Sequence, residues 1–535
     1  MTLTAAGSPY TGTPTIAAGV TVKVEPGTHL TVGTMTVNGT LLAEGTAETP
    51  VRFTGVKEKE VGEWRSIFFK PGSSASVLSH VEVANGGWRD GGYSTCNNGA
   101  ITVEGSAPTI TNSTIRDACG SGIRVPSGGA PTIANNDFIN AGAAIIYSAS
   151  SGQSGEINIH DNFVEGSGGI GITAYSGAAV TGKTLSGNVV ATPEGPGIVY
   201  SGSDIPGGIT ENTLSASKNN YIQISGTVGH SSTWNDGGTR VRFAEEVTVA
   251  AGATLHINPG VHLLNPAMTV EGTVLAEGTS EDPVRFTSST ETGVGQWKPI
   301  VFKPGSGSSV LSHVEVANGG WRDSGYPNCN KGAITIEGSS PTIVHSTIRE
   351  ACGYGITALS GGAPEIAEDT FVKAGAAIAY SASSGQSGEI NIHDNYVEGG
   401  SSGIGVSVKS GASVNAKALR GNTVVGTEGV GVSYSGIDVP GDVTENTLSA
   451  NAGNYILISG TVAHSSTWND GGTRVLVGEG LTIAAGVTLR INPGVHLLNP
   501  VMTVEGTLLA EGTAETPVRF TGAEEKAIGE WRSIF

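Results

Sequence analysis

The sequence has few cysteines, few methionines and few charged side chains, and it contains no long hydrophobic run. Among 535 residues there are 4 Cys, 4 Met and 11 Phe, and charged residues make up 14%. No stretch approaches the ~18 apolar residues that a membrane-spanning helix needs, so we expect no membrane span. Basic residues are outnumbered 28 to 47, and the net charge is −19. Because nucleic acids and anionic membranes require a basic face, we expect neither as a partner.

What the sequence does contain is glycine, 82 residues of it, between short runs of Val, Ile and Leu. Short apolar runs separated by Gly, Asn, Ser and Thr predict an all-β protein with a turn every few residues. The first residues, "MTLTAAGSPYTG", lack the basic and apolar regions of a signal peptide. Either a signal peptide has been removed or the chain is a piece of a longer protein, and we expect the second.

Long internal repeats dominate the chain. "SHVEVANGGWRD" occurs at 79–90 and 312–323, and "HSSTWNDGGTRV" at 230–241 and 464–475. The offset is 233 or 234 residues throughout. These repeats predict a lead-in at 1–13, a first unit at 14–246, a second at 247–480 and a truncated third at 481–535.

A finer period lies inside each unit. Segments such as "NNDFINAGAAI" and "DNFVEGSGGI" begin with a polar residue, followed after one spacer by an apolar residue and then by a small-residue turn. The leading polar residues recur every 23 to 27 positions: Ser113, Asn136, Asn162, Asn188 and Asn212, then Ser346, Asp369, Asn395, Asn422 and Asn446. Asn tolerates a left-handed corner and can bond to its copy in the next coil, so this column predicts a structural ladder.

This period predicts a β-solenoid whose coils stack at about 4.8 Å around a narrow apolar core. The coil pattern resembles that of right-handed parallel β-helix proteins, a fold shared by pectate-lyase-like enzymes and many long secreted bacterial surface proteins. The resemblance implies one continuous all-β solenoid of about 22 coils. It implies little about function, because this scaffold carries enzymes, adhesins and stalks alike.

Motifs that carry chemistry are weak. There is no "GHG" turn and no "DD" pair, and "HDN" at 160–162 and 393–395 falls on the predicted Asn corner. The His and Cys residues lack metal-ligand spacing. "RDGG" at 89–92 and "NDGG" at 235–238 could supply one or two Ca²⁺ oxygens, but Asx-Gly turns explain them without a metal. We expect no catalytic residue, no metal site and no cofactor, with Ca²⁺ as the alternative.

The four cysteines form two pairs with one-coil spacing. Cys96 and Cys119 are 23 residues apart, as are Cys329 and Cys352. Stacked one coil apart, the sulfurs of each pair would lie within disulfide reach, although two buried free thiols are the alternative. Disulfides would indicate an oxidising, extracellular location.

The longest excursions between coils are also aromatic. The first carries Trp88, Asp90 and Tyr93, and the second repeats them as Trp321, Asp323 and Tyr326. They form either a glycan- or partner-binding patch or lids that pack over the solenoid.

The sequence therefore favours an extracellular structural or adhesive repeat protein that forms a rod, stalk or head-to-tail filament at the cell surface or in a matrix. Because conspicuous features recur in each unit, a single active site is disfavoured, and the expected partners are other copies of the chain. The alternative is a carbohydrate-active protein, a polysaccharide lyase, a glycosidase or a non-catalytic glycan binder, with polysaccharide as its partner.

Overall fold

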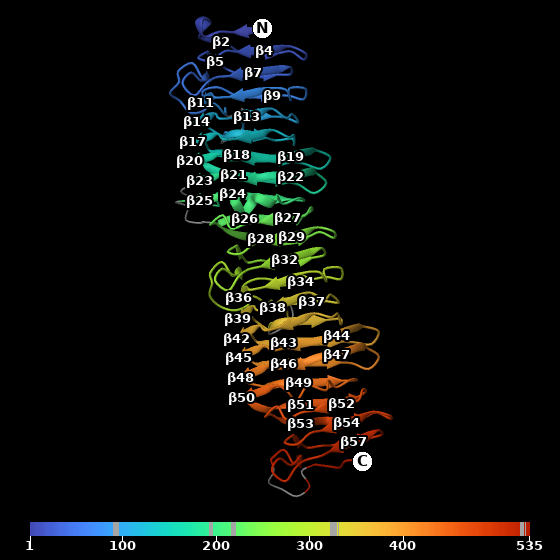
Figure 1. Cartoon of the computed structure of the whole chain (residues 1–535). Helices are drawn as coiled ribbons and strands as arrows, with labels where there is room; N and C mark the ends of the chain where they lie inside the picture. Colours follow the sequence, from blue (N-terminus) through green and yellow to red (C-terminus); the bar gives the residue numbers. More distant parts are fainter. Residues whose placement is uncertain are drawn as a thin grey trace. The chain divides into compact units, whose positions relative to one another are not determined.

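The computed structural model describes residues 1–88, 96–191, 196–215, 221–321, 329, 331–524, 529 and 531–535. The chain forms two compact units, Met1–Val247 and Thr248–Phe535. Each unit is an all-β parallel solenoid, and together they contain about 21 turns, one fewer than the sequence predicts. The predicted solenoid fold is confirmed. In Figure 1 the strands of each unit lie one above the next along the colour gradient.

A turn consists of three short strands, one in each of three parallel sheets. In the first unit, the first sheet contains β1 (Thr2–Leu3), β4 (Thr21–Val24), β7 (Thr40–Glu44), β10 (Val77–Ser79), β13 (Thr109–Thr111), β16 (Thr132–Ala134), β19 (Ser154–His160) and β22 (Ala179–Ser186). The second contains β2 (Tyr10–Gly12), β5 (His29–Val32), β8 (Val51–Thr54), β11 (Val81–Ala84), β14 (Thr114–Arg116), β17 (Asp137–Ile139), β20 (Phe163–Glu165), β23 (Val189–Ala191) and β25 (Thr213–Ser215). The third contains β3 (Thr15–Ile16), β6 (Met35–Val37), β9 (Ile67–Phe69), β12 (Gly99–Val103), β15 (Ser121–Val125), β18 (Ala143–Ala149), β21 (Gly168–Ala174), β24 (Ile198–Gly202) and β26 (Tyr221–Val228).

The second unit repeats the arrangement. Its first column contains β29 (Thr254–Ile257), β32 (Thr273–Glu277), β35 (Val310–Ser312), β38 (Thr342–Val344), β41 (Glu365–Ala367), β44 (Ser387–His393) and β47 (Ser413–Arg420). Its second contains β30 (His262–Leu264), β33 (Val284–Thr287), β36 (Val314–Ala317), β39 (Thr347–Arg349), β42 (Thr370–Val372), β45 (Tyr396–Glu398), β48 (Thr423–Val425) and β50 (Thr447–Ser449). Its third contains β31 (Met268–Val270), β34 (Ile300–Phe302), β37 (Gly332–Glu337), β40 (Tyr354–Leu359), β43 (Ala376–Ala382), β46 (Ser402–Val408), β49 (Val430–Gly436), β51 (Gly453–Val462) and β53 (Arg474–Ile483).

The remaining elements are few. The last turns of the second unit contain β52 (Ser466–Trp468), β54 (Thr488–Ile491), β55 (His496–Leu498), β56 (Met502–Val504), β57 (Thr507–Ala510) and β58 (Arg519–Thr521). Strands β27 (Ser232–Trp234) and β28 (Arg240–Val249) complete the strand order. The helices in the described part are two short 3₁₀ turns, η1 (Ala5–Gly7) and η2 (Gly207–Glu211).

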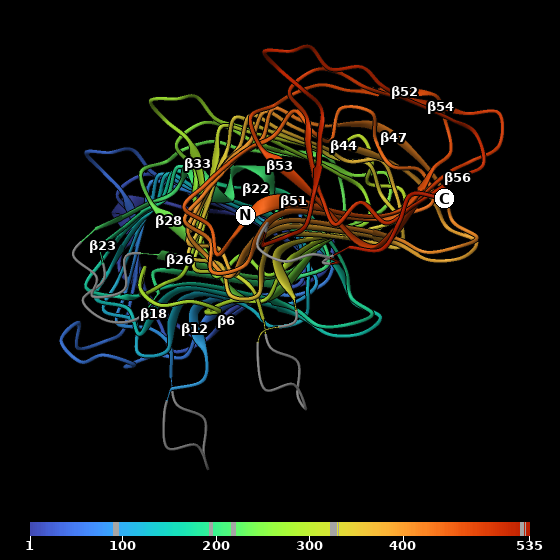
Figure 2. The ribbon, with the colours of Figure 1, turned by 90° about the horizontal axis from the view of Figure 1, so that it is seen from below.

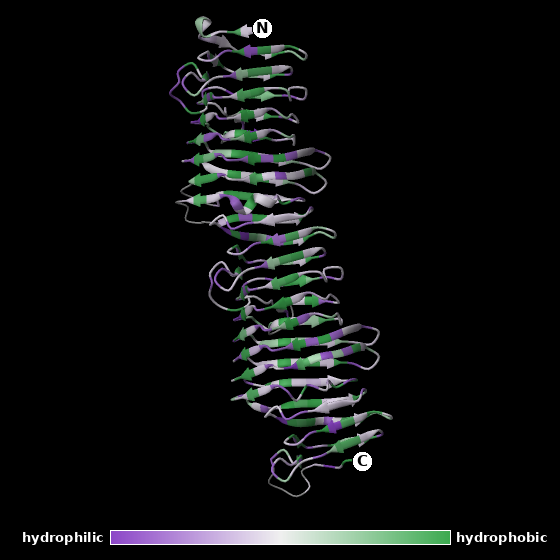
Figure 3. Cartoon of the chain, viewed as in Figure 1, coloured by the Kyte–Doolittle hydropathy of each residue, from purple (hydrophilic) through white to green (hydrophobic). Residues whose placement is uncertain are grey.

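The core of each unit is built from columns of aligned apolar side chains. In the first sheet Ile110 pairs with Ile133, which pairs with Ile159, and the column continues to Leu185. All four side chains are buried. The strands alternate inward and outward residues, so apolar and polar residues alternate along them (Figure 3). Seen from below in Figure 2, the turns of a unit overlie one another.

Sharp corners join the first and second sheets. The residue at each corner has a left-handed backbone, with φ of 50° at Asn112, 56° at Asn135 and 55° at Asp161. Left-handed backbone favours Asn, Asp and Gly, and Gly187 occupies the next corner with φ of 64°. The ladder asparagines, for which the sequence predicts this conformation, lie one residue later and do not adopt it. The ladder residue follows the corner and turns its side chain inward.

Candidate functional site

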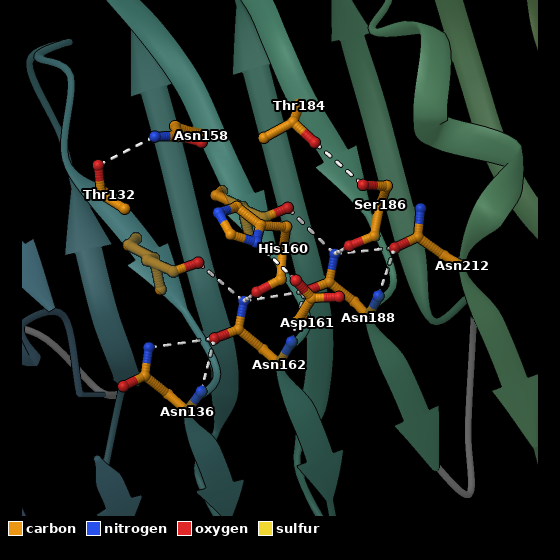
Figure 4. A network of polar contacts seen from close by, with 12 residues as sticks. Thr132, Asn136, Asn158, His160, Asp161, Asn162, Thr184, Ser186, Asn188 and Asn212 are labelled. Atoms are coloured by element: carbon orange, nitrogen blue, oxygen red, sulfur yellow. Dashed lines mark hydrogen bonds and ion pairs between the residues drawn. The ribbon is translucent and has the colours of Figure 1, made fainter. Parts of the chain in front are cut away.

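The ladder of the first unit is a continuous chain of buried amide hydrogen bonds (Figure 4). The side-chain oxygen of Asn162 accepts bonds from the backbone and side-chain nitrogens of Asn136, both at 3.1 Å. The Asn188 side-chain oxygen accepts the same two nitrogens of Asn162 at 3.1 and 2.9 Å. The Asn212 oxygen accepts those of Asn188 at 3.0 and 2.8 Å. Ser113 begins the run by donating its amide to Asn136 at 3.1 Å.

Each ladder asparagine also satisfies the backbone at its own corner. The Asn162 amide group donates to the carbonyls of Ile133 and His160, at 2.9 and 3.0 Å. The side chain therefore fills the hydrogen-bonding gap that opens where strands of two sheets diverge. Because these groups are buried and fully engaged with the protein, this column contributes stability rather than a ligand site.

The ladder of the second unit contains one charged-type residue, Asp369, at the position of Asn136. Its Oδ1 accepts the Ser346 amide at 2.8 Å, and its own amide donates to Asn395 at 3.0 Å. Its Oδ2 is buried without a hydrogen-bond partner in the structure. Burial raises the pKa of this carboxyl well above its usual range. The nearby Glu368 carboxylate raises the pKa further, and the hydrogen bond from the Ser346 amide only partly opposes the rise.

The rest of this second ladder repeats the first. Asn422 accepts the backbone and side-chain nitrogens of Asn395 at 3.1 and 2.9 Å, and Asn446 accepts those of Asn422 at 3.0 and 2.8 Å. Asn446 itself donates to the carbonyls of Leu419 and Val443, both at 2.8 Å.

The two predicted disulfides are present. Cys96 is bonded to Cys119 and Cys329 to Cys352, each with Cα atoms 5.6 Å apart, and no cysteine is free. Each bridge ties the end of an aromatic excursion to the next turn. Closing a 23-residue separation stabilises a fold by about 3 kcal/mol in the chain-entropy model.

The tryptophans of the excursions differ in exposure. Trp64 and Trp297 are buried, and their indole nitrogens donate to the carbonyls of Ala84 at 2.7 Å and Ala317 at 3.0 Å. Trp88 and Trp321 remain 47% and 36% exposed. The other members of the predicted patch, Asp90, Tyr93, Asp323 and Tyr326, lie outside the described residues.

A cleft of about 810 Å³ lies beside the second disulfide. Its lining includes Trp321, Tyr354, Ser401 and Ser402 together with both cysteines of that bridge. The ammonium of Lys298 lies 5.8 Å from the centre of the Trp321 ring. In the first unit the counterpart of Tyr354 is Ser121, so the second unit presents one more aromatic ring here. Aromatic faces beside hydroxyl groups suit the stacking and hydrogen bonding of a sugar.

Tyr354 also borders a shallow groove of about 480 Å³ across the third sheet. Along its floor Thr357, Ala379, Gly405 and Ser433 follow one another on adjacent strands. The corresponding residues of the first unit are Arg124, Ile146, Gly171 and Val199, which align in the same way. Larger side chains therefore cover in the first unit the surface that the second leaves open.

A polar pocket of about 490 Å³ in the first unit contains a histidine–carboxylate pair. His230 Nδ1 lies 3.1 Å from Asp204 Oδ2, which also accepts the Gly182 amide at 2.9 Å. The pair recurs as His464 and Asp438, at 2.8 Å. A histidine beside a carboxylate can move a proton, but here the carboxylate also holds a turn of the backbone, and the motif is present in both units. Its recurrence favours a structural role.

No cluster of three or more His, Cys, Asp and Glu side chains in the described residues is arranged to hold a metal ion. At the "NDGG" turn, Asp236 accepts the Gly238 amide at 2.8 Å, and Asp470 accepts the Gly472 amide at 2.9 Å. These are Asx turns, in which the carboxylate serves its own backbone. The "RDGG" segment at 89–92 lies outside the described residues.

Comparison with known proteins supports the fold. The family model of the right handed beta helix region matches residues 67–190. The predicted resemblance to right-handed parallel β-helix proteins is thereby confirmed. No curated protein matches the chain. In the described part, no helix has both the length and the apolar character needed to cross a membrane.

Proposed function

We propose that this chain is an extracellular structural or adhesive element, in which a repeated β-helix unit presents the same surfaces again and again. The observation that carries the proposal is recurrence. The buried ladder, the disulfide, the tryptophan pair and the His–Asp turn all appear once in each unit at matching positions. An enzyme needs one site with mutually positioned acid and base, whereas a stalk or matrix protein works by repetition.

The interior of each unit suits a structural role. Its turns are joined by backbone pairing on three sides, by buried amide ladders and by a disulfide. Stability then accumulates turn by turn, so the protein can be lengthened without a new core. The two disulfides support a location outside the cytoplasm.

The location is tested in cells that produce the protein. A membrane-impermeant amine reagent should label its lysines on intact cells, and peptide mapping without reduction should recover both cystine-linked peptides. Four free thiols in a protein shielded from the reagent would contradict an extracellular location.

The structural role is tested with the purified full chain. Electron microscopy and sedimentation at increasing concentration should show association between copies, end to end or side by side. Particles that stay single over the whole range, and that bind no surface or matrix component, would contradict the proposal.

A second candidate, a carbohydrate-active or glycan-binding protein, is favoured by the cleft beside Trp321 and Tyr354. The test is a panel of polysaccharides, followed by binding, by absorbance of unsaturated products and by new reducing ends. Trp321→Ala should abolish binding, and Tyr354→Ser, which restores the residue of the first unit, should weaken it. Turnover abolished by one acidic substitution would replace the structural proposal with an enzyme.

A further inference from the structure

Two histidines of the second unit lie on consecutive turns and share one pocket. His313 is the corner residue between β35 and β36, and His345 is the corner residue between β38 and β39. The turns are in register, because the His313 amide donates to the Val344 carbonyl at 3.3 Å. The two ring centres are 5.1 Å apart, with the planes inclined by 33°. Both rings line a pocket of about 320 Å³.

This spacing is the one that two imidazoles adopt around a single metal ion. With metal–nitrogen bonds of about 2.0–2.1 Å and tetrahedral angles, the centres of two bound rings lie about 5 Å apart. Consecutive turns of a parallel solenoid lie about 4.8 Å apart, so the backbone itself holds the two rings at this separation. A shared ion can therefore contact both rings without a change in the distance between the two turns.

The other ring nitrogens are already engaged. His313 Nδ1 lies 3.0 Å from the hydroxyl of Ser312, and His345 Nδ1 lies 3.1 Å from a carboxylate oxygen of Glu368. When each Nδ1–H donates to its oxygen, each Nε2 keeps its lone pair. A carboxylate behind a histidine orients the ring and makes it a better ligand. Both rings are thus prepared to coordinate through Nε2.

The surroundings supply oxygen and negative charge. The hydroxyl residues Thr279 and Thr347 and the carboxylate Glu315 line the same pocket. The Glu315 carboxylate is paired with Arg349 at 2.7 Å and with Arg285 at 3.5 Å. Arg349 is also paired with Glu350 at 3.3 Å. Water and these oxygens can complete a coordination shell around an ion held by two nitrogens.

We propose that His313 and His345 bind a divalent transition-metal ion of the class of Zn²⁺, Ni²⁺ and Cu²⁺. Imidazole suits these ions, whereas Ca²⁺ and Mg²⁺ prefer oxygen ligands throughout. The ion joins two consecutive turns of the second unit through their side chains. This site is additional to the proposed structural function and does not depend on it.

The first unit provides the matched control. Its corner residues at the equivalent positions are His80 and Asn112, so it has one imidazole instead of two. The Ser79 hydroxyl lies 3.1 Å from His80 Nδ1, as Ser312 does in the second unit. Asn112 has a φ of 50° and His345 a φ of 53°. Asn is at least as well suited as His to that backbone, so His345→Asn should fold normally.

The experiment uses the full chain without a histidine tag, loaded with one equivalent of Cu²⁺. Pulsed electron paramagnetic resonance counts the imidazole nitrogens that coordinate the copper. The wild type should give a two-imidazole signal, and His345→Asn should lose it. Glu368→Gln should weaken binding by about 10-fold, because it removes the carboxylate behind His345. The pair Asn112→His and Asn135→Glu, made in the first unit, should create a second two-imidazole site.

Titration of Zn²⁺ and Ca²⁺ by calorimetry completes the test. Zn²⁺ should bind the wild type more tightly than His345→Asn by at least tenfold, and Ca²⁺ should not distinguish them. A wild-type copper signal with a single imidazole, or a two-imidazole signal that survives His345→Asn in a folded protein, would overturn the proposal.

Discussion

The two units place different residues at one buried position of the same ladder. At Asn136 the side chain offers an oxygen to Ser113 and a nitrogen to Ile110 and Asn162. At Asp369 the first of these functions is kept and the second is lost, because Oδ2 replaces the nitrogen and remains without a partner. In the first unit every polar side-chain atom at this position has a partner. In the second unit Oδ2 can donate a hydrogen bond to the ladder only when the carboxyl of Asp369 is protonated.

The outer surfaces differ more than the interiors. Ile146 and Val199 on the third sheet of the first unit become Ala379 and Ser433 in the second. The inward residues beside them on those strands, Ile145 and Ile198, remain apolar as Ile378 and Val432. A close-packed core limits substitution, whereas the outward row can change and can create a new surface.

The largest expected effect comes from removing a central ladder residue. Asn188→Ala leaves the nitrogens of Asn162 without their buried acceptor, and Asn422→Ala does the same for Asn395. Each buried unsatisfied group costs about 1–3 kcal/mol, so each variant should lose about 3 kcal/mol or more. Urea unfolding with hydrogen exchange on peptides of each unit measures the loss.

The exposed Asn415→Ala is the control and should change stability little. An Asn188→Ala protein as stable as this control would show that the ladder contributes nothing. A loss confined to one unit would show that the two ladders differ beyond Asp369.

Reducing the disulfides should have the next largest effect and should act on both units alike. Both bridges join residues 23 apart, so each should contribute about 3 kcal/mol. Cys96→Ser with Cys119→Ser removes one bridge and Cys329→Ser with Cys352→Ser the other. Urea unfolding of the two double variants measures each contribution. Clearly unequal losses in the free energy of unfolding would contradict the prediction that the two bridges contribute equally.

Asp369→Asn should stabilise the second unit at neutral pH by about 1–3 kcal/mol, the cost of one buried unsatisfied group. The folded-state pKa of Asp369 is raised above its unfolded value, near 3.8. Below that value the carboxyl is protonated in both states and does not lower the free energy of unfolding. As pH rises above it, the free energy of unfolding falls. The advantage of the variant should therefore vanish at acidic pH.

The reverse change, Asn136→Asp, should give the first unit the same pH dependence. Unfolding of both variants followed between pH 3 and pH 8 measures it. A pH-independent gain for Asp369→Asn would show that the carboxyl is not the cause.

The smallest effect is expected at the surface. Glu82 bonds to Arg52 and Arg116, each at 2.8 Å. Burial raises the pKa of this carboxyl, but the two arginines outweigh it and lower the pKa below its usual value. Its contribution should therefore be present at neutral pH and be lost as pH falls through the lowered pKa. Glu82→Gln should cost about 1 kcal/mol, because the arginines are partly solvated.

The counterpart Glu315→Gln should cost less. Arg349 lies 2.7 Å from Glu315, but Arg285 lies 3.5 Å away. Thermal unfolding of both variants with unit-specific exchange compares them. A larger loss at Glu315 would reverse the predicted order.

The fold and the disulfides could be predicted because both depend on the short period alone. A polar residue, a spacer and an apolar residue recurring each turn leave only a stacked arrangement, and a spacing of 23 places Cys96 beside Cys119. The ladder residues were located for the same reason. The sequence pattern places the left-handed corner one residue too late, because Asn is suited both to that backbone and to the buried amide position.

The histidine pair could not be recognised from spacing. His313 and His345 are 32 residues apart, since their turn includes an aromatic excursion. Counting from the ladder residue would have revealed part of it, because His345 directly precedes Ser346. The unpaired oxygen of Asp369 and the open groove at Ala379 depend on what lies across from them in the next turn. Such contacts depend on which residues pair between consecutive turns, and the amino-acid sequence alone does not give that register.

The one-residue difference between the copies has a genetic consequence. "EGSGGIG" at 165–171 becomes "EGGSSGIG" at 398–405, and the strands on both sides still pair in the same register. The unit tolerates this change within a bend and otherwise repeats a whole number of turns. A whole unit can therefore be gained or lost by recombination between the repeated segments of the gene. Chain length can then vary among descendants of one cell while every remaining turn keeps its neighbours.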